Sequence, residues 1–255
     1  MKTLVIQSYR ETGVPVWIQR CLESVRGWAV AAGYDYEFVG DEIFDMVPEW
    51  YRENAGHRPP VITDLGRLLL AEAALARGVE RCIWLDADVF VFDPSGLRID
   101  TGLGYAFGRE LWVQPAAKGG LKVYRNVHNA VSVFEAGNRF LDFYIHAAEH
   151  IIRGASGSVP NQVVGTKFLT AVHNIMGFNL IDAVGMTSPL VIRDLAGGGG
   201  PALERLRAVT PAPLAAVNIC SSLVGVETDG VDVSEAMVTA AMDGMALLQD
   251  RRASG

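Results

Sequence analysis

The sequence has few of the features that mark a membrane protein or a disulfide-stabilised one. Its 255 residues include only three cysteines, Cys21, Cys82 and Cys220. They are odd in number and lack the close spacing of a zinc or redox motif, which predicts reduced thiols and no disulfide framework. No apolar run approaches the roughly 20 residues that a bilayer span requires. Because the first residues are typical of a strand and not of a signal peptide, we expect a cytoplasmic protein without a transmembrane segment.

Positive charge is also scarce. Lysine and arginine together number 22 against 29 aspartate and glutamate residues, which gives a formal net charge of −7. This balance argues against binding to a phosphate backbone as the main task, although one small basic pocket remains compatible with it. We therefore predict no nucleic-acid partner. Apolar residues make up 50% of the chain, enough to build the core of a large domain.

Apolar patterning in the first part of the chain predicts alternating strands and helices. We expect strands at 3–7, 34–40 and 82–85, helices at 16–32 and 63–77, and an irregular segment at 41–60. Asp64 falls near the start of the second helix and suits its N-terminus. A β-α-β-α-β order predicts a mainly parallel sheet, whose ligand sites lie outside the carboxyl ends of its strands.

The pattern in the second part of the chain is mixed. It predicts strands at 102–113 and 129–137, followed by helices at 138–154, 163–177 and 232–252. No linker-like change in composition and no internal repeat divides the sequence. We therefore predict a single α/β domain over residues 1–255.

Two carboxylates interrupt the stretch RCIWLDADVFVFDP, residues 81–94. Asp86 and Asp88 stand one residue apart between β-branched, aromatic and aliphatic neighbours. Two buried carboxylates stay ionised only if a cation, ordered donors or water compensates their charge. Side chains at i and i+2 of a strand point to the same side, so this pair is expected to converge on one Mg²⁺ or Mn²⁺ ion. A diphosphate bound to that ion becomes a better leaving group.

With these residues the chain resembles the DXD-containing sugar transferases of the GT-A fold, in the branch of the fungal initiating mannosyltransferases and the glucosylating clostridial toxins. The segment TDLGRLLLAEAALARGVERCIWLDADV places Asp64 and Arg67 at that family's DxxR helix start, before a strand that ends in D-x-D. HNAVSVFEAGNRFLDFYI and VGTKFLTAVHN continue the likeness more loosely. The resemblance implies a Rossmann-like, mainly parallel central sheet flanked by helices, with a mixed C-terminal half. Residues from about 1 to 95 would bind the nucleotide, and those from about 96 to 255 the donor sugar and acceptor.

The resemblance also implies roles for individual residues. Asp64 would accept hydrogen bonds from the donor sugar's hydroxyls, Arg67 would lie near the sugar and diphosphate, and Asn129 would contact the sugar. The segment AAVNICSSL stands where the family's late metal-binding segment lies, and it offers an oxygen ligand from Asn218, Ser221 or Ser222. The residues implied in binding the nucleotide are Gln7, Ser8 and Tyr9, which follow the first strand, together with Asp86.

The function that these features predict is a Mn²⁺- or Mg²⁺-dependent hexosyl transfer from a nucleotide-diphosphate sugar to a glycan, lipid or protein acceptor. The resemblance implies that the transfer retains the configuration of the sugar. One alternative is a phosphatase-like hydrolase with Asp86 as nucleophile and Asp88 as acid and base. Another is a binding module for a sugar or nucleotide without turnover. For Asp64 and Arg67 themselves, the alternative is an ordinary helix-surface ion pair with an N-cap. We expect His128, next to Asn129, to be structural.

Overall fold

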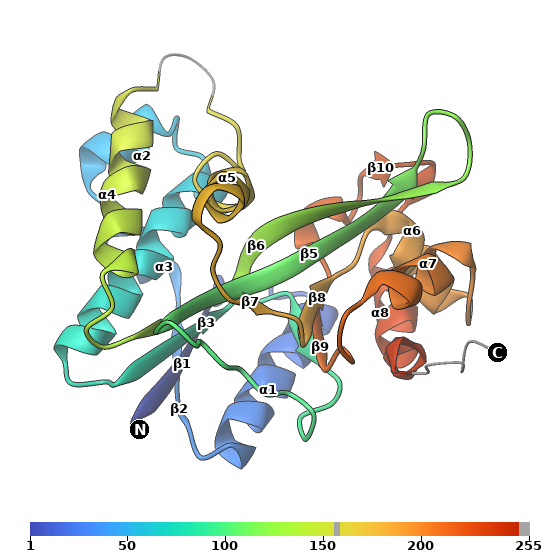
Figure 1. Ribbon diagram of the computed structural model, residues 1–255, viewed down its shortest axis with the longest axis horizontal. Helices are drawn as coiled ribbons and strands as arrows, with labels where there is room; N and C mark the ends of the chain where they lie inside the picture. Colours follow the sequence, from blue (N-terminus) through green and yellow to red (C-terminus); the bar gives the residue numbers. More distant parts are fainter. Residues whose placement is uncertain (156–158, 250–255) are drawn as a thin grey trace.

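The computed structural model describes residues 1–155 and 159–249 and shows an α/β fold (Figure 1). Its helices are α1 (Val16–Ala31), α2 (Glu49–Asn54), α3 (Pro59–Ala76), α4 (Phe140–Arg153), α5 (Thr166–Met176), α6 (Pro189–Ala196), α7 (Pro201–Val209) and α8 (Glu235–Asp243), with 3₁₀ turns η1 (Asp41–Phe44), η2 (Ser221–Leu223) and η3 (Met245–Leu248). Its strands are β1 (Thr3–Ser8), β2 (Asp35–Val39), β3 (Arg81–Leu85), β4 (Val89–Val91), β5 (Tyr105–Pro115), β6 (Leu121–Glu135), β7 (Leu180–Ile181), β8 (Val184–Met186), β9 (Ala216–Asn218), β10 (Glu227–Thr228) and β11 (Val231–Asp232).

A six-stranded mixed sheet forms the centre of the fold, with strand order β2-β1-β3-β6-β5-β7. β1 pairs in parallel with β2 and β3, and β5 pairs in parallel with β7. β6 runs antiparallel to both β3 and β5. The carboxyl ends of β1, β2 and β3 therefore lie along one edge of the sheet, as the predicted β-α-β-α-β order requires.

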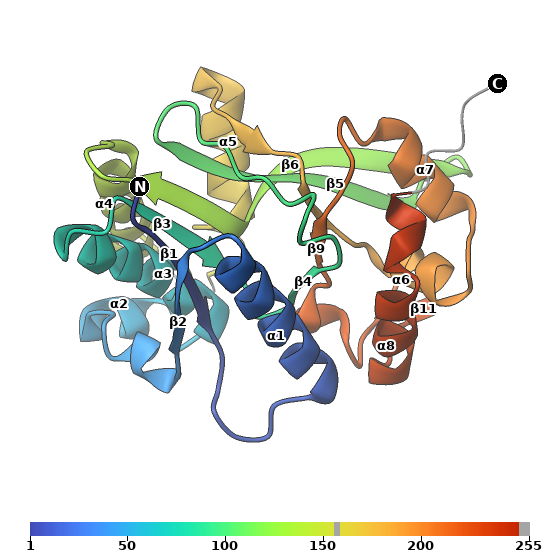
Figure 2. The ribbon, with the colours of Figure 1, turned by 90° about the horizontal axis from the view of Figure 1, so that it is seen from below.

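The two faces of this sheet are covered by different helices because side chains alternate along each strand. Trp84 and Phe107 lie in the core cluster that also contains side chains of α3 and α4, whereas Ile83 and Ala106 lie in the cluster with α1. Figure 1 shows α2, α3, α4 and α5 grouped on one side, and Figure 2 looks onto α1 on the other. A sheet between two helical layers is the arrangement predicted for the fold class, which is confirmed.

A second group of elements packs against a long hairpin made by β5 and β6 (Figure 1). The core of this group includes Leu111 and Val113 of β5, together with apolar side chains of α6, α7 and α8. A three-stranded sheet of order β4-β9-β8 connects it to the end of β3. The hairpin thus links the central sheet to the C-terminal helices.

Several predicted element boundaries are wrong. α3 begins at Pro59, so Asp64 lies inside the helix and not at its N-terminus, and Arg58 is the residue that precedes it. The segment 41–60 contains η1 and α2 and is less irregular than expected. β6 begins at Leu121, eight residues before the predicted strand. The predicted helix 232–252 divides into α8 and η3, and its last three residues lie outside the described part of the chain.

No helix in residues 1–155 and 159–249 combines the length and the apolar character that crossing a bilayer demands. The three cysteines, all within these residues, carry free thiols.

Candidate functional site

The carboxyl ends of the three parallel strands open into a cavity of about 1020 Å³. The end of β1 and the residue after it contribute Ser8 and Tyr9 to its lining, η1 after β2 contributes Ile43 and Phe44, and the turn after β3 contributes residues 86–88. The remaining walls come from α3, from the β5–β6 hairpin, from residues 161–166 and from the segment after β9. A volume of this size accommodates a ligand larger than a single sugar.

Asp86 and Asp88 lie on a turn and not along one strand. β3 ends at Leu85, and the backbone N–H of Val89 donates to the carbonyl of Asp86 over 3.0 Å, which closes the turn before β4 begins in a different sheet. The same carbonyl accepts from Gln7 Nε2, and the Asp86 N–H donates to the carbonyl of Ala130. The strand ends at Leu85 as predicted, so a turn and not strand geometry places the pair, and it directs both carboxylates to the cavity.

Asp88 is held from two sides in a buried position, with 8% of its surface exposed. Asn218 Nδ2 donates to its Oδ1 over 2.5 Å, and the backbone N–H of Ser221 donates to its Oδ2 over 2.7 Å. Burial and the nearby charge of Asp86 raise the pKa of Asp88, while the hydrogen bonds from Ser221 lower it. The two carboxylates are thus close enough to repel each other, and a cation between them would relieve that repulsion.

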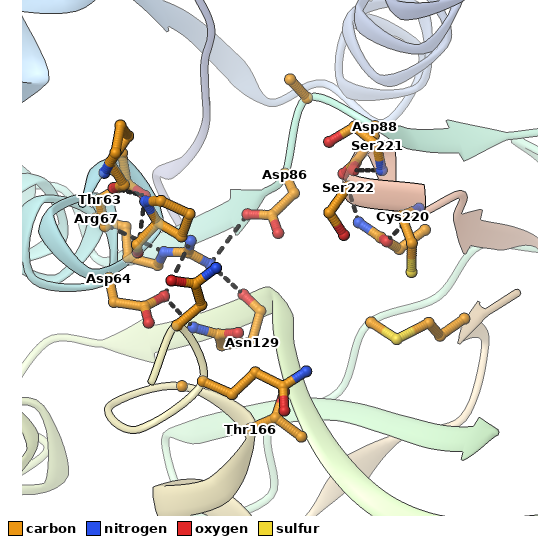
Figure 3. Close-up of a pocket in the computed structure, with 18 of the residues that line it drawn as sticks. Thr63, Asp64, Arg67, Asp86, Asp88, Asn129, Thr166, Cys220, Ser221 and Ser222 are labelled. Atoms are coloured by element: carbon orange, nitrogen blue, oxygen red, sulfur yellow. Dashed lines mark hydrogen bonds and ion pairs between the residues drawn. The ribbon is translucent and has the colours of Figure 1, made fainter. Parts of the chain in front are cut away.

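Arg67 connects Asp86 to the neighbouring helix. Its Nη1 lies 3.0 Å from Asp86 Oδ1 and its Nη2 lies 3.2 Å from Asp64 Oδ1. Nη1 also donates to the carbonyl of Asn129 over 2.9 Å, and the guanidinium lies over the ring of Trp84. Figure 3 shows Asp86 between this network and the separate group of Asp88 and Ser221.

Asp64 and Arg67 are buried, with 5% and 8% of their surfaces exposed, which excludes the surface ion pair. Burial raises the pKa of Asp64 to about 6, although Arg67 and Asn129 lower it. Burial lowers the pKa of Arg67, but the charges of Asp86 and Asp64 outweigh this effect and raise it overall. Arg67 therefore stays protonated and supplies the positive charge of this part of the cavity.

Asn129 reaches the site because the β5–β6 ladder is irregular there. Phe107 pairs with Ser132 and Gly108 with His128, so residues 129–131 have no partner on β5. The Asn129 side chain instead donates to Asp64 Oδ1 over 2.7 Å. β-Bulges of this kind commonly redirect a side chain next to a functional site. The structure brings Asp64, Arg67 and Asn129 together, as predicted.

The three residues at and just after the end of β1 that were predicted to bind the nucleotide divide into two groups. Ser8 and Tyr9 line the cavity, where the resemblance places the nucleotide. Gln7 does not, because its side chain is fully buried and its amide is bonded to the carbonyl of Asp86 and to the hydroxyl of Tyr36. Gln7 therefore supports the D-x-D turn from behind, and the structure does not support its predicted contact with a nucleotide.

The carboxylates of Asp86 and Asp88 suit a hard divalent cation that takes most of its ligands from a bound substrate and from water. Among the described residues no group of three or more His, Cys, Asp or Glu side chains could hold a metal. Asn218 directs its NH₂ to Asp88 while its Oδ1 accepts from the N–H of Cys220, so it supports Asp88 and does not offer the predicted oxygen ligand. Ser221 and Ser222 line the cavity beside the pair. Two carboxylates with open positions are the usual protein share of a Mg²⁺ site.

Two further observations concern residues outside this group. His128 is fully buried, its Nε2 lies 3.2 Å from the carbonyl of Val184, and burial lowers its pKa to about 4, which confirms a structural role. Glu110, which was not a candidate from the sequence, lines the cavity from β5 as a buried carboxylate. Only the alternation of polar and apolar residues in ELWVQ could have indicated it.

No protein-family model matches the sequence, and neither does any curated protein with which it was compared. Among solved structures, the chain is similar to a glycosyltransferase involved in the glycosylation of the major capsid of PBCV-1, with a TM-score of 0.45 and 12% identity over 86% of this chain and 94% of that chain. It is also similar to A197 from STIV, with a TM-score of 0.29 and 13% identity over 68% of this chain and 78% of that chain. The inference of function therefore depends on the residues of the cavity.

Proposed function

We propose that the protein transfers a hexose from a nucleoside-diphosphate sugar to an acceptor, with a divalent cation bound at Asp86 and Asp88. The observation that carries this proposal is the network of Arg67 with Asp64, Asp86 and Asn129, which lies beside the D-x-D turn in one cavity. A cation site next to a buried guanidinium suits a diphosphate, because both neutralise its oxygens.

Each part of the network has a task in this proposal. The planar fork of Arg67 is held by two carboxylates and by the carbonyls of Asn129 and Thr63, and the guanidinium presents its positive charge and a remaining N–H to the diphosphate and the sugar. Asp64 and Asn129 face the sugar hydroxyls as acceptor and donor. Ser8 and Tyr9 contact the nucleoside at the end of β1. Asn218 and Ser221 fix the orientation of Asp88.

Mn²⁺ or Mg²⁺ would be held by Asp86 and Asp88, with diphosphate oxygens and water in the other positions, and would supply Lewis-acid stabilisation of the leaving diphosphate. In the transfer, the bond between the anomeric carbon and the diphosphate oxygen breaks, and its electron pair stays on the diphosphate. The acceptor oxygen forms the new bond to the anomeric carbon from the same face of the sugar, and its proton passes to the departing diphosphate. Because the acceptor enters on the face that the diphosphate leaves, this course retains the configuration of the donor sugar.

The phosphatase-like alternative gains nothing from the structure. That chemistry commonly uses a lysine beside the nucleophile, and no lysine is among the described residues that line the cavity. Asp86 Oδ1 already accepts from Trp84 Nε1 over 2.6 Å and pairs with Arg67, which restrains the carboxylate. The other alternative, a binding module for a sugar or nucleotide without turnover, gives the buried Arg67 network no catalytic role.

Arg67 gives the sharpest test of the proposal. Arg67→Ala would leave Asp64 as a buried carboxylate without its cationic partner and cost about 3 kcal/mol or more of stability, so Arg67→Lys is the better variant. Lysine keeps the charge but loses the fork, and we expect at least a tenfold loss, about 1.4 kcal/mol, in the hydrolysis of the preferred nucleotide sugar. The assay takes UDP-, GDP- and TDP-hexoses with Mn²⁺ and without an acceptor.

Arg109→Lys is the matched control, because Arg109 also pairs with an aspartate, Asp182, but does not line this cavity. It should hydrolyse the same nucleotide sugar at the wild-type rate. Full turnover in Arg67→Lys would make the network purely structural. If the wild type hydrolyses no nucleotide sugar but does cleave phosphomonoesters, the transferase proposal is wrong.

A further inference from the structure

The β5–β6 hairpin forms a wall of the cavity with a regular polar and aromatic pattern. Glu110, Trp112 and Gln114 of β5 line the cavity, as do Tyr124 and Asn126 of β6. The intervening Leu111 and Val113 are buried in the core with α6 and α7. In the register of the hairpin, Glu110 lies opposite Asn126 and Trp112 lies opposite Tyr124. We call these four residues, Glu110, Trp112, Tyr124 and Asn126, the hairpin wall.

The Glu110 carboxylate and the Asn126 amide of the hairpin wall form one hydrogen bond with each other, which leaves other hydrogen-bonding positions of both groups open. Asn126 Nδ2 donates to Glu110 Oε1 over 2.6 Å. Among the described residues, no donor reaches Glu110 Oε2. Glu110 is nevertheless buried, with 8% of its surface exposed, and burial raises its pKa. A carboxylate oxygen that is open to a cavity and has no protein donor is suited to accept from a ligand hydroxyl.

The aromatic pair supplies a flat apolar surface next to these acceptors. Trp112 is half-buried with its ring supported by the core of the second helical group, and Tyr124 is 39% exposed beside it. Lys122 Nζ lies 4.1 Å from the centre of the Tyr124 ring and covers one side of it, which leaves Trp112 as the main platform. A pyranose ring has an apolar face of C–H groups and a rim of hydroxyls, and it matches an aromatic ring bordered by hydrogen-bonding groups.

The charge around the wall selects against an anionic ligand. Glu110 lines the same cavity as Asp86 and Asp88, the two carboxylates that are proposed to hold the cation. A third negative charge repels phosphates and uronic acids at this position but tolerates an uncharged sugar.

We infer that the hairpin wall is the acceptor site and that it binds a neutral pyranose residue of a glycan. The ring stacks on Trp112 beside Tyr124, and hydroxyls donate to Glu110 and Asn126. This inference rests on the proposed sugar transfer, because the site counts as an acceptor site only if a donor is cleaved next to it. The inference narrows the acceptor class to a glycan. A pyranose ring has a flat apolar face with hydroxyls around it, and neither a lipid tail nor a peptide backbone has such a surface.

Saturation-transfer NMR on the full chain tests the inference without requiring turnover. The probes are methyl α-D-glucopyranoside, methyl α-D-galactopyranoside and methyl α-D-mannopyranoside, with methyl β-D-glucuronide as the anionic counterpart. We expect at least one neutral glycoside to receive saturation on one face of its ring, and the glucuronide to receive none. Trp112→Ala should weaken that binding at least tenfold, Trp112→Phe should weaken it less, and Glu110→Gln should admit the glucuronide.

Trp50→Phe is the matched control, because Trp50 carries Arg153 over its ring and does not line the cavity. It should bind the glycosides as the wild type does. Nucleotide-sugar hydrolysis is measured on the same wild-type sample. Hydrolysis without any glycoside binding would overturn the inference alone, and glycoside binding that survives Trp112→Ala would overturn it as well. Trp112-dependent saturation of uridine or guanosine protons would assign the wall to the nucleoside and overturn the acceptor role. Glycoside binding without any hydrolysis would refute the proposed function, and the acceptor role with it.

Discussion

At the scale of single residues, the site depends on buried charges that hold one another in place. Arg67 is enclosed by Asp64, Asp86 and the carbonyl of Asn129, and the burial of Arg67 and Asp64 limits the screening of these contacts by water. A network of this kind contributes little net stability compared with an apolar core, because burying its charges is costly. Its value lies in fixing the direction of the guanidinium before a ligand arrives.

The burial of His128 predicts a pH dependence of stability. Its pKa is about 4 in the folded chain and near 6.5 when the chain unfolds. Its contribution to stability is therefore fully present above pH 6.5 and is lost as the pH falls through 4, by about 3 kcal/mol in total. Chemical denaturation between pH 7 and pH 4 should show the wild type losing stability relative to His128→Gln. If the stability of the two proteins changes equally with pH, the pKa shift of His128 is contradicted.

Asp64 changes the stability of the folded chain in the opposite direction to His128 over part of this pH range. Its pKa is raised to about 6, so its contribution to stability is greatest below its unfolded pKa and is lost as the pH rises through 6. The comparison with His128→Gln cancels this effect because both proteins retain Asp64.

At the scale of the elements, close contact between α5 and β6 positions Asn129. A Cβ atom at Gly165, just before α5, would lie 2.9 Å from Asn129 Nδ2 and 3.1 Å from its Oδ1. Gly165 has φ −81° and ψ −114°, a combination outside the main regions open to an L-residue, so alanine is disfavoured by the backbone and also displaces the amide. We expect Gly165→Ala to remain folded with a lowered melting temperature and to lose nucleotide-sugar hydrolysis about tenfold, because Asn129 leaves Asp64.

Gly27→Ala is the control for that variant. Nothing lies within 4 Å of a Cβ atom at Gly27, which is inside α1 and away from the cavity. It should raise stability by up to about 1 kcal/mol through helix propensity and leave hydrolysis unchanged. Equal hydrolysis by Gly165→Ala and the wild type would show that the contact with Asn129 does not matter.

The elements also show how far the sequence could predict the site. Asp64 and Arg67 share a helix face at i and i+3, and Asp86 and Asp88 follow a buried strand, so local spacing together with the family resemblance was enough to group them. The bulge at 129–131 was not predictable from local pattern, because it depends on how β6 pairs with β3 and β5. The orientation of the Asn218 amide likewise depends on a contact 130 positions away in the chain.

Other elements were missed because their local signals are weak. The first half of β6, LKVYRNV, carries charged residues that face solvent, and its length is fixed only by pairing with β5. Glu110 and Trp112 became candidates for a ligand wall once this pairing was known. The start of α3 was misplaced because Arg58 provides no side-chain cap, although Pro59 and Pro60 occupy the first helical turn and are typical there.

At the scale of the whole molecule, the cavity lies where two separately packed parts of the fold meet. The central sheet with α3 and α5 supplies Arg67, Asp64 and Asn129, and β9 with the turn that follows it supplies the supports of Asp88. The hairpin of β5 and β6 crosses from one part to the other, as Figure 1 shows. This arrangement places the proposed donor and acceptor sites on different walls of one cavity.

The central claim is that Asp86 and Asp88 bind a divalent cation together with a nucleoside diphosphate. The most direct measurement is calorimetric titration of UDP and GDP into the protein with and without Mn²⁺, for the wild type and for Asp88→Asn. This substitution keeps the shape of the side chain but removes its charge, and Asp243→Asn, remote from the cavity, serves as the control. We predict Mn²⁺-dependent binding of one diphosphate by the wild type and the control, and at least a tenfold loss, about 1.4 kcal/mol, in Asp88→Asn, which stays folded although it loses one of the hydrogen bonds from Asn218 and Ser221. Binding that is equally strong in Asp88→Asn, or a wild type that binds neither diphosphate with Mn²⁺, would contradict it.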